Sequence, residues 1–292
     1  SGMISIVGRP NVGKSTLTNA LVGEKIAIVT NKPQTTRNRI CAVVNREGCQ
    51  FVFLDTPGLH KARTRLGDYM VKVVKESVAD VDAVLLLVEP IPHIGGPEAE
   101  LIRRIKELNV PAVLVINKID TVEKEELLSV MQVYGAAHDF AAIVPISAKR
   151  NEGVDELLGL LAQFLPEGPQ LFPEDMVTDQ PERQVCAEII REKLLLCLDK
   201  EIPHGTAVEI TTFSERDDGI IDLDATIYCE KASHKGIIIG KGGAMLKKIS
   251  TLARTDIEAF MGTKVFLQTW VKVKENWRDN MNLIKNFGYR DE

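Results

Sequence analysis

Short apolar runs and amphipathic segments alternate along the first half of the chain. The runs expected to form strands are 3–7, 40–44, 51–54, 83–88, 112–116 and 142–144. The segments expected to form helices are 16–21, 67–79, 97–108, 124–137 and 154–165. A turn near Glu47-Gly48 predicts that the second and third strands form a hairpin. The alternation predicts an α/β domain over residues 1–166, with a mostly parallel sheet and helices on both faces.

The pattern changes after residue 166. Residues 167–183 are rich in proline and acidic residues, which predicts a linker. Residues 184–292 predict the order helix, strand, strand, helix, helix, strand, helix, which makes a smaller α+β domain. The last of these helices is expected over 277–287. The third is expected to align its apolar side chains along one face: Met245, Leu246, Ile249, Leu252, Ala253 and Ile257.

A phosphate loop stands between the first strand and the first helix. Residues 8–15, Gly-Arg-Pro-Asn-Val-Gly-Lys-Ser, fit the pattern GxxxxGK[ST]. Backbone N–H groups and the helix dipole make such a loop an anion site. Its lysine can reach the outer phosphates, and its serine hydroxyl can bind Mg²⁺. The residues predicted to contact the phosphates are Gly8, Asn11, Val12, Gly13, Lys14, Ser15 and Thr16.

The sequence also names a base. Residues 117–120, Asn-Lys-Ile-Asp, follow a predicted strand at the edge where open α/β sheets bind ligands. The Asp120 carboxylate can accept two parallel hydrogen bonds from guanine, whereas adenine would leave it unpaired. Lys118 can lie along the base, and a backbone N–H near Ala148 can donate to guanine O6. We predict GTP and GDP as ligands, bound by Asn117, Lys118, Asp120, Ser147, Ala148 and Lys149.

The polar loop 26–39 contains Gln-Thr-Thr-Arg at 34–37. In nucleotide switches, a threonine of this loop contacts Mg²⁺ and the γ-phosphate, and it holds the loop only while the triphosphate is intact. We favour Thr36 for this role, and Thr35 stays open as the alternative. Asp55 ends a predicted strand and can hold Mg²⁺ through water. The predicted Mg²⁺ ligands are therefore Ser15, Thr36 and Asp55.

The motif Asp-Thr-Pro-Gly at 55–58 places Gly58 where its N–H can donate to the γ-phosphate. Ras-like enzymes have a water-orienting glutamine at the next position, which here is Leu59, so slow intrinsic hydrolysis is expected. Asn11 resembles an asparagine that binds K⁺ in related GTPases lacking this glutamine. The alternative that Asn11 only braces the loop has equal weight. The residues assigned to catalysis are Lys14, Thr36, Gly58 and Asn11.

Residues 240–243, Gly-Lys-Gly-Gly, precede an amphipathic helix and resemble the GxxG loop of type II K-homology (KH) single-strand RNA-binding domains. Residues 235–274 hold eight basic and two acidic residues, a local charge of +6 in a chain of net charge −5. Trp270 shares a strand face with Lys272, and both base stacking and core packing remain open for it. The predicted RNA-binding residues are Gly240, Lys241, Gly242, Gly243, Lys247 and Lys272.

The composition changes this picture little. The chain has 292 residues, of which 45% are hydrophobic and 26% charged, enough apolar material for two cores. Its five cysteines form no CxxC pair, so we expect reduced thiols and neither a disulfide framework nor a metal site. No apolar run approaches a membrane span, and no signal peptide precedes the first strand. A cytoplasmic protein is expected.

Taken in order, these motifs resemble the bacterial Era GTPase family over nearly the whole chain. The resemblance rests on the phosphate loop, 34–37, 55–59, 117–120, 172–175, the GxxG loop and 270–274. It implies a P-loop GTPase domain and a type II KH domain in a GTP-controlled factor for small ribosomal subunit assembly. It further implies binding to the 3′ end of the small-subunit ribosomal RNA. Some members of the family also associate peripherally with the inner membrane, which the acidic charge of this chain does not support. We expect a monomer with no small-molecule substrate besides GTP.

Two other classes of function remain as alternatives. A nucleotide kinase would use the same phosphate loop, but it needs a second substrate site and lid arginines. It would also leave residues 117–120 and 147–149 unexplained. An RNA-binding module with an inactive nucleotide domain would not need the Mg²⁺ and γ-phosphate contacts predicted here. GTP turnover measured with and without RNA separates the three.

Overall fold

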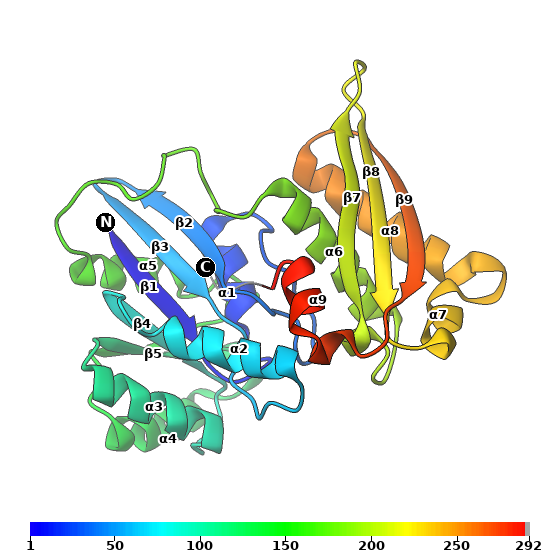
Figure 1. Cartoon of the computed structure of the whole chain (residues 1–292). Coiled ribbons are helices and arrows are strands. Elements are labelled where there is room, and N and C mark those ends of the chain that lie inside the picture. The colour runs from blue at the N-terminus through cyan, green and yellow to red at the C-terminus, as the bar shows by residue number, and fades with distance from the viewer. Residues whose placement is uncertain (290–292) are drawn as a thin grey trace. The chain divides into compact units, whose positions relative to one another are not determined.

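The computed structural model describes residues 1–289, which fold as two compact units. The first unit comprises residues 1–27, 36–62 and 67–179. The second comprises residues 28–35, 63–66 and the chain from 180 onward. Each unit has an apolar core of its own, so each is described by itself (Figure 1).

The sheet of the first unit has the strand order β2-β3-β1-β4-β5-β6. Its strands are β1 Gly2–Val7, β2 Ile40–Arg46, β3 Cys49–Asp55, β4 Ala83–Val88, β5 Ala112–Ile116 and β6 Ala142–Pro145. All neighbours are parallel except β2 and β3, which form an antiparallel hairpin that turns at Gly48. The predicted sheet and hairpin are confirmed. Because β3 and β4 flank β1, the carboxyl end of β1 lies at a switch point of strand order, where open α/β sheets bind ligands.

Helices cover both faces of this sheet. Their bounds are α1 Lys14–Val22, α2 Arg65–Glu76, α3 Gly96–Leu108, α4 Lys124–Ala137 and α5 Val154–Leu161, the last continued by a 3₁₀ turn at Ala162–Phe164. Leu17 of α1 and Leu161 of α5 belong to the core on one face. Val74 of α2, Ile105 of α3 and Val130 of α4 belong to the core on the other. The strands between them are buried on both sides, which explains their continuous apolar runs.

The segment after α5 packs onto the edge strand β2. The amide of Val43 donates to the carbonyl of Val177 at 2.9 Å, and the Thr178 hydroxyl donates to the carbonyl of Cys41 at 2.7 Å. The fully buried amide of Gln50 donates to the carbonyl of Phe172 at 2.8 Å. These contacts satisfy backbone groups that an edge strand would otherwise expose. Residues 172–179 are therefore held on the first unit, although their composition is that of a linker.

The second unit contains a three-stranded sheet in the order β7-β8-β9, with β8 antiparallel to β7 and parallel to β9. Its elements are α6 Glu182–Cys197, β7 Ala207–Glu215, β8 Ile221–Cys229, α7 Ala232–Ile239, α8 Ala244–Met261, β9 Val265–Val273 and α9 Met281–Asn286. This is the predicted order of elements. Apolar side chains of α6 and α8 form one core with the sheet, including Ile190 and Ile257.

Two expectations for this unit are wrong. The last helix does not run through 277–287: a 3₁₀ turn, Trp277–Asp279, ends before α9 begins at Met281. The Asn280 side chain accepts hydrogen bonds from the amides of Asn282 and Leu283, which caps α9 and stops the helix from extending backward. Leu252 is 42% exposed and does not share the buried face of α8 that Ile249 belongs to.

Candidate functional site

The phosphate loop joins β1 to α1 in a conformation that needs glycine. Gly13 has a φ of +100°, in the left-handed region that favours glycine. A β-carbon at Gly8 would lie 2.5 Å from the carbonyl oxygen of Leu87. The loop can therefore close tightly at the N-terminus of α1, where backbone N–H groups and the helix dipole favour an anion.

The Lys14 side chain is buried within this loop. Its ammonium donates to the carbonyls of Gly8 at 3.2 Å and Arg9 at 3.0 Å. Burial lowers the pKa of Lys14 to about 8, and the nearby charge of Asp55 works in the opposite direction. An anion bound beside the ammonium would offset this desolvation, as phosphate oxygens do in phosphate loops.

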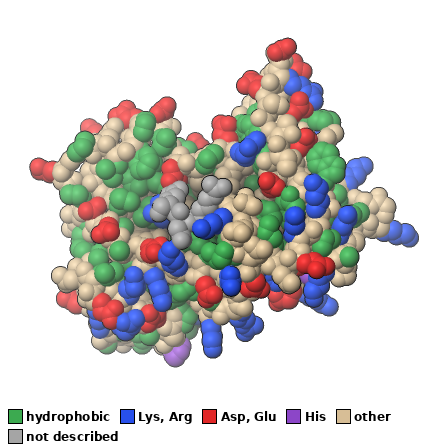
Figure 2. Space-filling model, in the orientation of Figure 1, with side chains coloured by type: hydrophobic (Ala, Val, Ile, Leu, Met, Phe, Trp, Pro, Cys, Tyr) green, Lys and Arg blue, Asp and Glu red, His purple; other side chains and the backbone are tan. Residues whose placement is uncertain are grey.

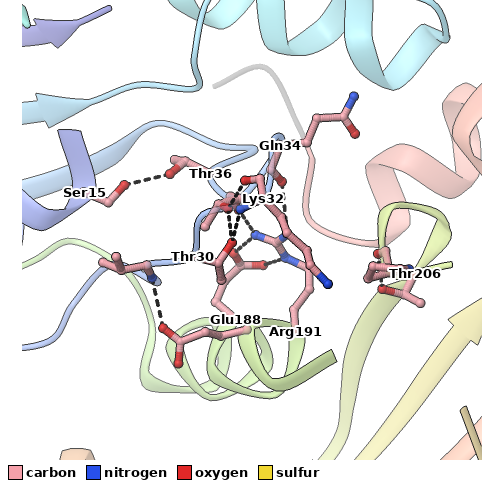
Figure 3. A network of polar contacts seen from close by, with 12 residues as sticks. Ser15, Thr30, Lys32, Gln34, Thr36, Glu188, Arg191 and Thr206 are labelled. Atoms are coloured by element: carbon pink, nitrogen blue, oxygen red, sulfur yellow. Dashed lines mark hydrogen bonds and ion pairs between the residues drawn. The ribbon is translucent and has the colours of Figure 1, made fainter. Parts of the chain in front are cut away.

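The three predicted Mg²⁺ ligands lie together. The Ser15 hydroxyl lies 2.8 Å from the Thr36 hydroxyl (Figure 3). It donates to Asp55 Oδ2 at 2.6 Å. Asp55 Oδ1 is buried and has no hydrogen-bond partner among the described residues. Burial raises the pKa of Asp55 to about 6 against the opposing effects of Ser15 and Lys14. Two hydroxyls and a carboxylate with an unused oxygen fit the oxygen ligands that Mg²⁺ takes.

The structure separates the two threonines that the sequence left open. The Thr36 side chain is buried beside Ser15, whereas the Thr35 hydroxyl is 2.7 Å from the Thr30 hydroxyl and donates to the carbonyl of Lys32 at 2.7 Å. Thr35 is thus occupied inside its own loop. The geometry therefore favours Thr36 over Thr35 as the candidate Mg²⁺ ligand.

The Asp-Thr-Pro-Gly segment lies against the phosphate loop. A β-carbon at Gly58 would lie 2.6 Å from Pro10 Cα, so only glycine permits this approach. The amide of Leu59 donates to the carbonyl of Gly8 at 3.1 Å. The Leu59 side chain is buried in the core shared with α2, α3 and α4 and offers no polar group to water.

The residues predicted to bind the base meet at the carboxyl ends of β5 and β6. The Asn117 side chain donates to the carbonyl of Val12 at 2.8 Å and accepts from the amide of Ala148 at 3.0 Å, which ties the phosphate loop to both strand ends. The Ser147 hydroxyl donates to Asp120 Oδ1 at 2.7 Å and holds the pKa of that carboxyl below its usual range. The Ala148 amide, near which a donor to guanine O6 was predicted, is engaged by Asn117 in this structure.

Glu89 is not among the residues predicted from the sequence. This carboxylate, just after β4, forms ion pairs with both Arg9 of the phosphate loop and Lys118 of the base-binding motif. The Lys118 ammonium also donates to the carbonyl of Asn11 at 2.7 Å. Burial would raise the pKa of Glu89, but the two cations outweigh burial and lower it. No local motif marks this glutamate, because its partners are distant in the chain.

The GxxG loop of the second unit is open to a ligand. Gly242 and Gly243 have φ of +58° and +80°, and a β-carbon on either would meet nothing within 4 Å. Gly240 is more restricted, since its β-carbon would lie 2.7 Å from Met245 Cβ. The eight basic side chains between 235 and 274 are all exposed, and Lys and Arg side chains lie over β9 and α7 in Figure 2.

The exposed face of β9 carries two aromatic rings. Trp270 is 45% exposed and Phe266 is 48% exposed, so core packing, the alternative for Trp270, is wrong. Lys272 is exposed on the same strand. Aromatic rings between basic side chains are the usual platform for single-stranded nucleic acid. This face and the GxxG loop form the candidate RNA surface.

Two family models match parts of the chain. A model described as 50S ribosome-binding GTPase matches residues 3–118, and one described as KH domain matches residues 201–278. GTPase Era of Ruminiclostridium cellulolyticum is 53% identical over 290 residues, covering 99% of this chain and 97% of that protein. The chain belongs to the Era GTPase family. The Era protein of Alkaliphilus metalliredigens is 52% identical over 99% of the chain.

Solved structures of this family agree with the fold. A crystal structure of Era in complex with MgGDPNP and nucleotides 1506–1542 of 16S ribosomal RNA has a TM-score of 0.95 at 38% identity and covers 99% of both chains. An Aquifex aeolicus Era variant bound to GDP.AlF4⁻ matches with the same TM-score and coverage. Membership confirms the predicted P-loop GTPase domain, the KH domain and the assignment as a GTPase. Within the described residues, no helix is both long and apolar enough to cross a membrane.

Proposed function

We propose that the chain is a GTP-controlled switch that binds the 3′ end of small-subunit ribosomal RNA and acts in assembly of the small ribosomal subunit. The proposal rests on a switch threonine and an RNA surface occurring in the same chain. The Thr36 hydroxyl lies beside Ser15, in a chain that also carries a basic surface with an open GxxG loop. A related Era protein with bound MgGDPNP and 16S ribosomal RNA nucleotides supports the pairing of these two ligands.

We further propose that residues 1–166 bind GTP, that residues 167–183 form a linker and that residues 184–292 bind RNA. Ser15, Thr36 and Asp55 would hold Mg²⁺, which supplies charge neutralisation between the β- and γ-phosphates. The Lys14 ammonium would hold the outer phosphates, and the Gly58 N–H would donate to the γ-phosphate. Loss of that phosphate removes the partners of Thr36 and Gly58 together, which is how such switches report hydrolysis.

The direct test measures RNA affinity in two nucleotide states. An oligonucleotide with the 3′-terminal sequence of small-subunit ribosomal RNA is titrated with the Mg²⁺ complex of GDPNP or of GDP, with a scrambled oligonucleotide as control. We expect tighter binding with GDPNP and only weak, salt-sensitive binding of the scrambled RNA. Equal affinity in both nucleotide states would contradict a switch. If the protein hydrolyses GTP but binds the specific and the scrambled oligonucleotide equally, an enzyme of another kind would be favoured.

A bound K⁺ could take the place of the glutamine that Ras-like enzymes have at the position of Leu59. Hydrolysis needs positive charge near the bridging oxygen, and the Asn11 side-chain carbonyl could hold K⁺ there. We expect faster turnover in K⁺ than in Na⁺ at constant ionic strength, and loss of this difference in Asn11→Ala. Equal rates of the unmodified protein in the two salts would leave Asn11 with a bracing role only.

Three further expectations belong to the proposal. The chain acts as a monomer in the cytoplasm, it uses no small-molecule substrate besides GTP, and its contact with the inner membrane is at most peripheral. Size-exclusion chromatography with light scattering tests the first of these. Sedimentation with vesicles of bacterial lipid composition tests the last.

A further inference from the structure

The loop 28–35 belongs to the second unit, although it lies in the sequence between α1 and β2 of the first. Helix α6 binds it at several points. The amide of Val29 donates to Glu192 Oε1 at 2.9 Å, and the Lys32 ammonium donates to the carbonyl of Leu198 just beyond α6. The next residue after this loop is Thr36, whose hydroxyl meets Ser15.

Arg191 of α6 contacts the two loop residues that precede Thr36 in the chain. Its side chain is fully buried, and its guanidinium donates to the carbonyl of Gln34 at 3.3 Å and to the carbonyl of Thr35. On its other edge it is paired with Glu188, one helical turn earlier, with Nε 2.8 Å from Oε1 (Figure 3). Burial would lower the pKa of Arg191, but Glu188, together with Tyr289 and Glu192, outweighs burial and raises it.

The backbone that Arg191 holds is strained. Gln34 has a φ of +59°, which a residue with a β-carbon rarely adopts. Such a conformation persists only when surrounding contacts over-determine it, and it is frequent at switch segments. Here the contacts are the bonds from Arg191 to the carbonyls of Gln34 and Thr35, together with the bonds of the Thr35 hydroxyl to Thr30 and Lys32. They set the direction in which the chain enters Thr36.

We propose that Arg191, fixed by Glu188, is a positioning residue for the triphosphate state, because it holds the 34–35 backbone so that Thr36 reaches Mg²⁺ and the γ-phosphate. This inference rests on the proposed role of Thr36. A planar guanidinium with several donors can hold two carbonyls and a carboxylate at once, which an ammonium cannot do in the same geometry. If the triphosphate favours this loop conformation, linkage requires that contacts favouring the conformation also raise the affinity for the triphosphate relative to GDP.

The experiment compares the affinities of the full-length protein for fluorescent GDPNP and GDP at fixed Mg²⁺. Removing Arg191 alone would leave Glu188 uncompensated, so the main variant combines Arg191→Met with Glu188→Gln. Arg191→Lys retains the charge but not the fork. Arg183→Met makes the same substitution at an exposed position of α6 and is the matched control. Thr36→Ala is measured alone and combined with the main variant.

The main variant is expected to lose about tenfold or more of the preference for GDPNP over GDP, with GDP affinity unchanged. Arg191→Lys should lose part of that preference and Arg183→Met none. In the Thr36→Ala background the main variant should have no further effect on the preference, because both changes remove the same contact, that of Thr36 with Mg²⁺ and the γ-phosphate. A purely structural role would lower both affinities, or would add to the effect of Thr36→Ala.

Either of those results overturns the proposal for Arg191. If Thr36→Ala alone keeps the full preference for GDPNP, the proposed role of Thr36 fails, and the inference fails with it. If Thr36→Ala loses the preference but the main variant keeps it, only the inference about Arg191 fails. The two failures are therefore distinguishable in one set of measurements.

Discussion

Asp120→Asn is expected to invert the base preference of the site, from GTP toward xanthosine triphosphate. The carboxylate accepts from two guanine donors, and charge-assisted hydrogen bonds contribute about 1.5–3 kcal/mol each. An amide would instead donate to the C2 oxygen of xanthine, while its carbonyl could still accept from Ser147, as Asp120 does at 2.7 Å. We expect GTP affinity to fall by about 100-fold or more.

Competition between the two nucleotides for a fluorescent analogue measures this inversion. Asp139→Asn is the matched control, because Asp139 is exposed in the loop between α4 and β6. It makes the same change of charge away from the site. A variant that still prefers GTP by the original margin would show that another group reads the base.

Gly242→Asp is expected to abolish specific RNA binding while GTP hydrolysis continues at its basal rate. The substitution places a carboxylate and a β-carbon where backbone would approach phosphate, and like charges at that distance repel strongly. Gly242 has a φ of +58° in open space, and aspartate tolerates the left-handed region better than most residues, so the fold should survive. We expect a loss of about 100-fold or more in RNA affinity.

Gly219→Asp provides the control. Gly219 also has a positive φ, +79°, and open space around its β-carbon position, but it lies near the β7–β8 turn and outside the GxxG loop. Its RNA affinity should change only by the small, salt-dependent amount that one added charge produces. A folded Gly242→Asp protein that binds RNA as tightly as the Gly219→Asp control would remove the GxxG loop from the RNA surface.

Where local pattern decides structure, the sequence was sufficient. The strand-and-helix alternation of the first unit reflects strands buried on both faces, and each buried run is visible without knowledge of its neighbours. The phosphate loop and residues 117–120 are short motifs whose chemistry lies within a few consecutive residues. Their spacing alone placed them at strand ends, where the structure has them.

Where contacts with distant residues decide the structure, the local pattern was insufficient. Residues 277–287 have helical spacing throughout, but Trp277 is buried with its indole N–H donating to the carbonyl of Gly205 at 2.9 Å, and Asn280 caps a separate helix. Trp270 could not be assigned to core or surface, because a strand with one exposed face shows the same alternation whichever face meets the helices.

The sequence by itself determined the two-domain order, the guanine nucleotide and the GxxG loop, because these depend on residues adjacent in the chain. Only the tertiary structure decided that Thr36 rather than Thr35 meets Ser15, and that Glu89 joins Arg9 to Lys118. It alone brought Arg191 to the carbonyl of Thr35, 156 residues away. Contacts of that range follow from how elements pack and from which buried polar groups need partners, and neither is visible in a local pattern.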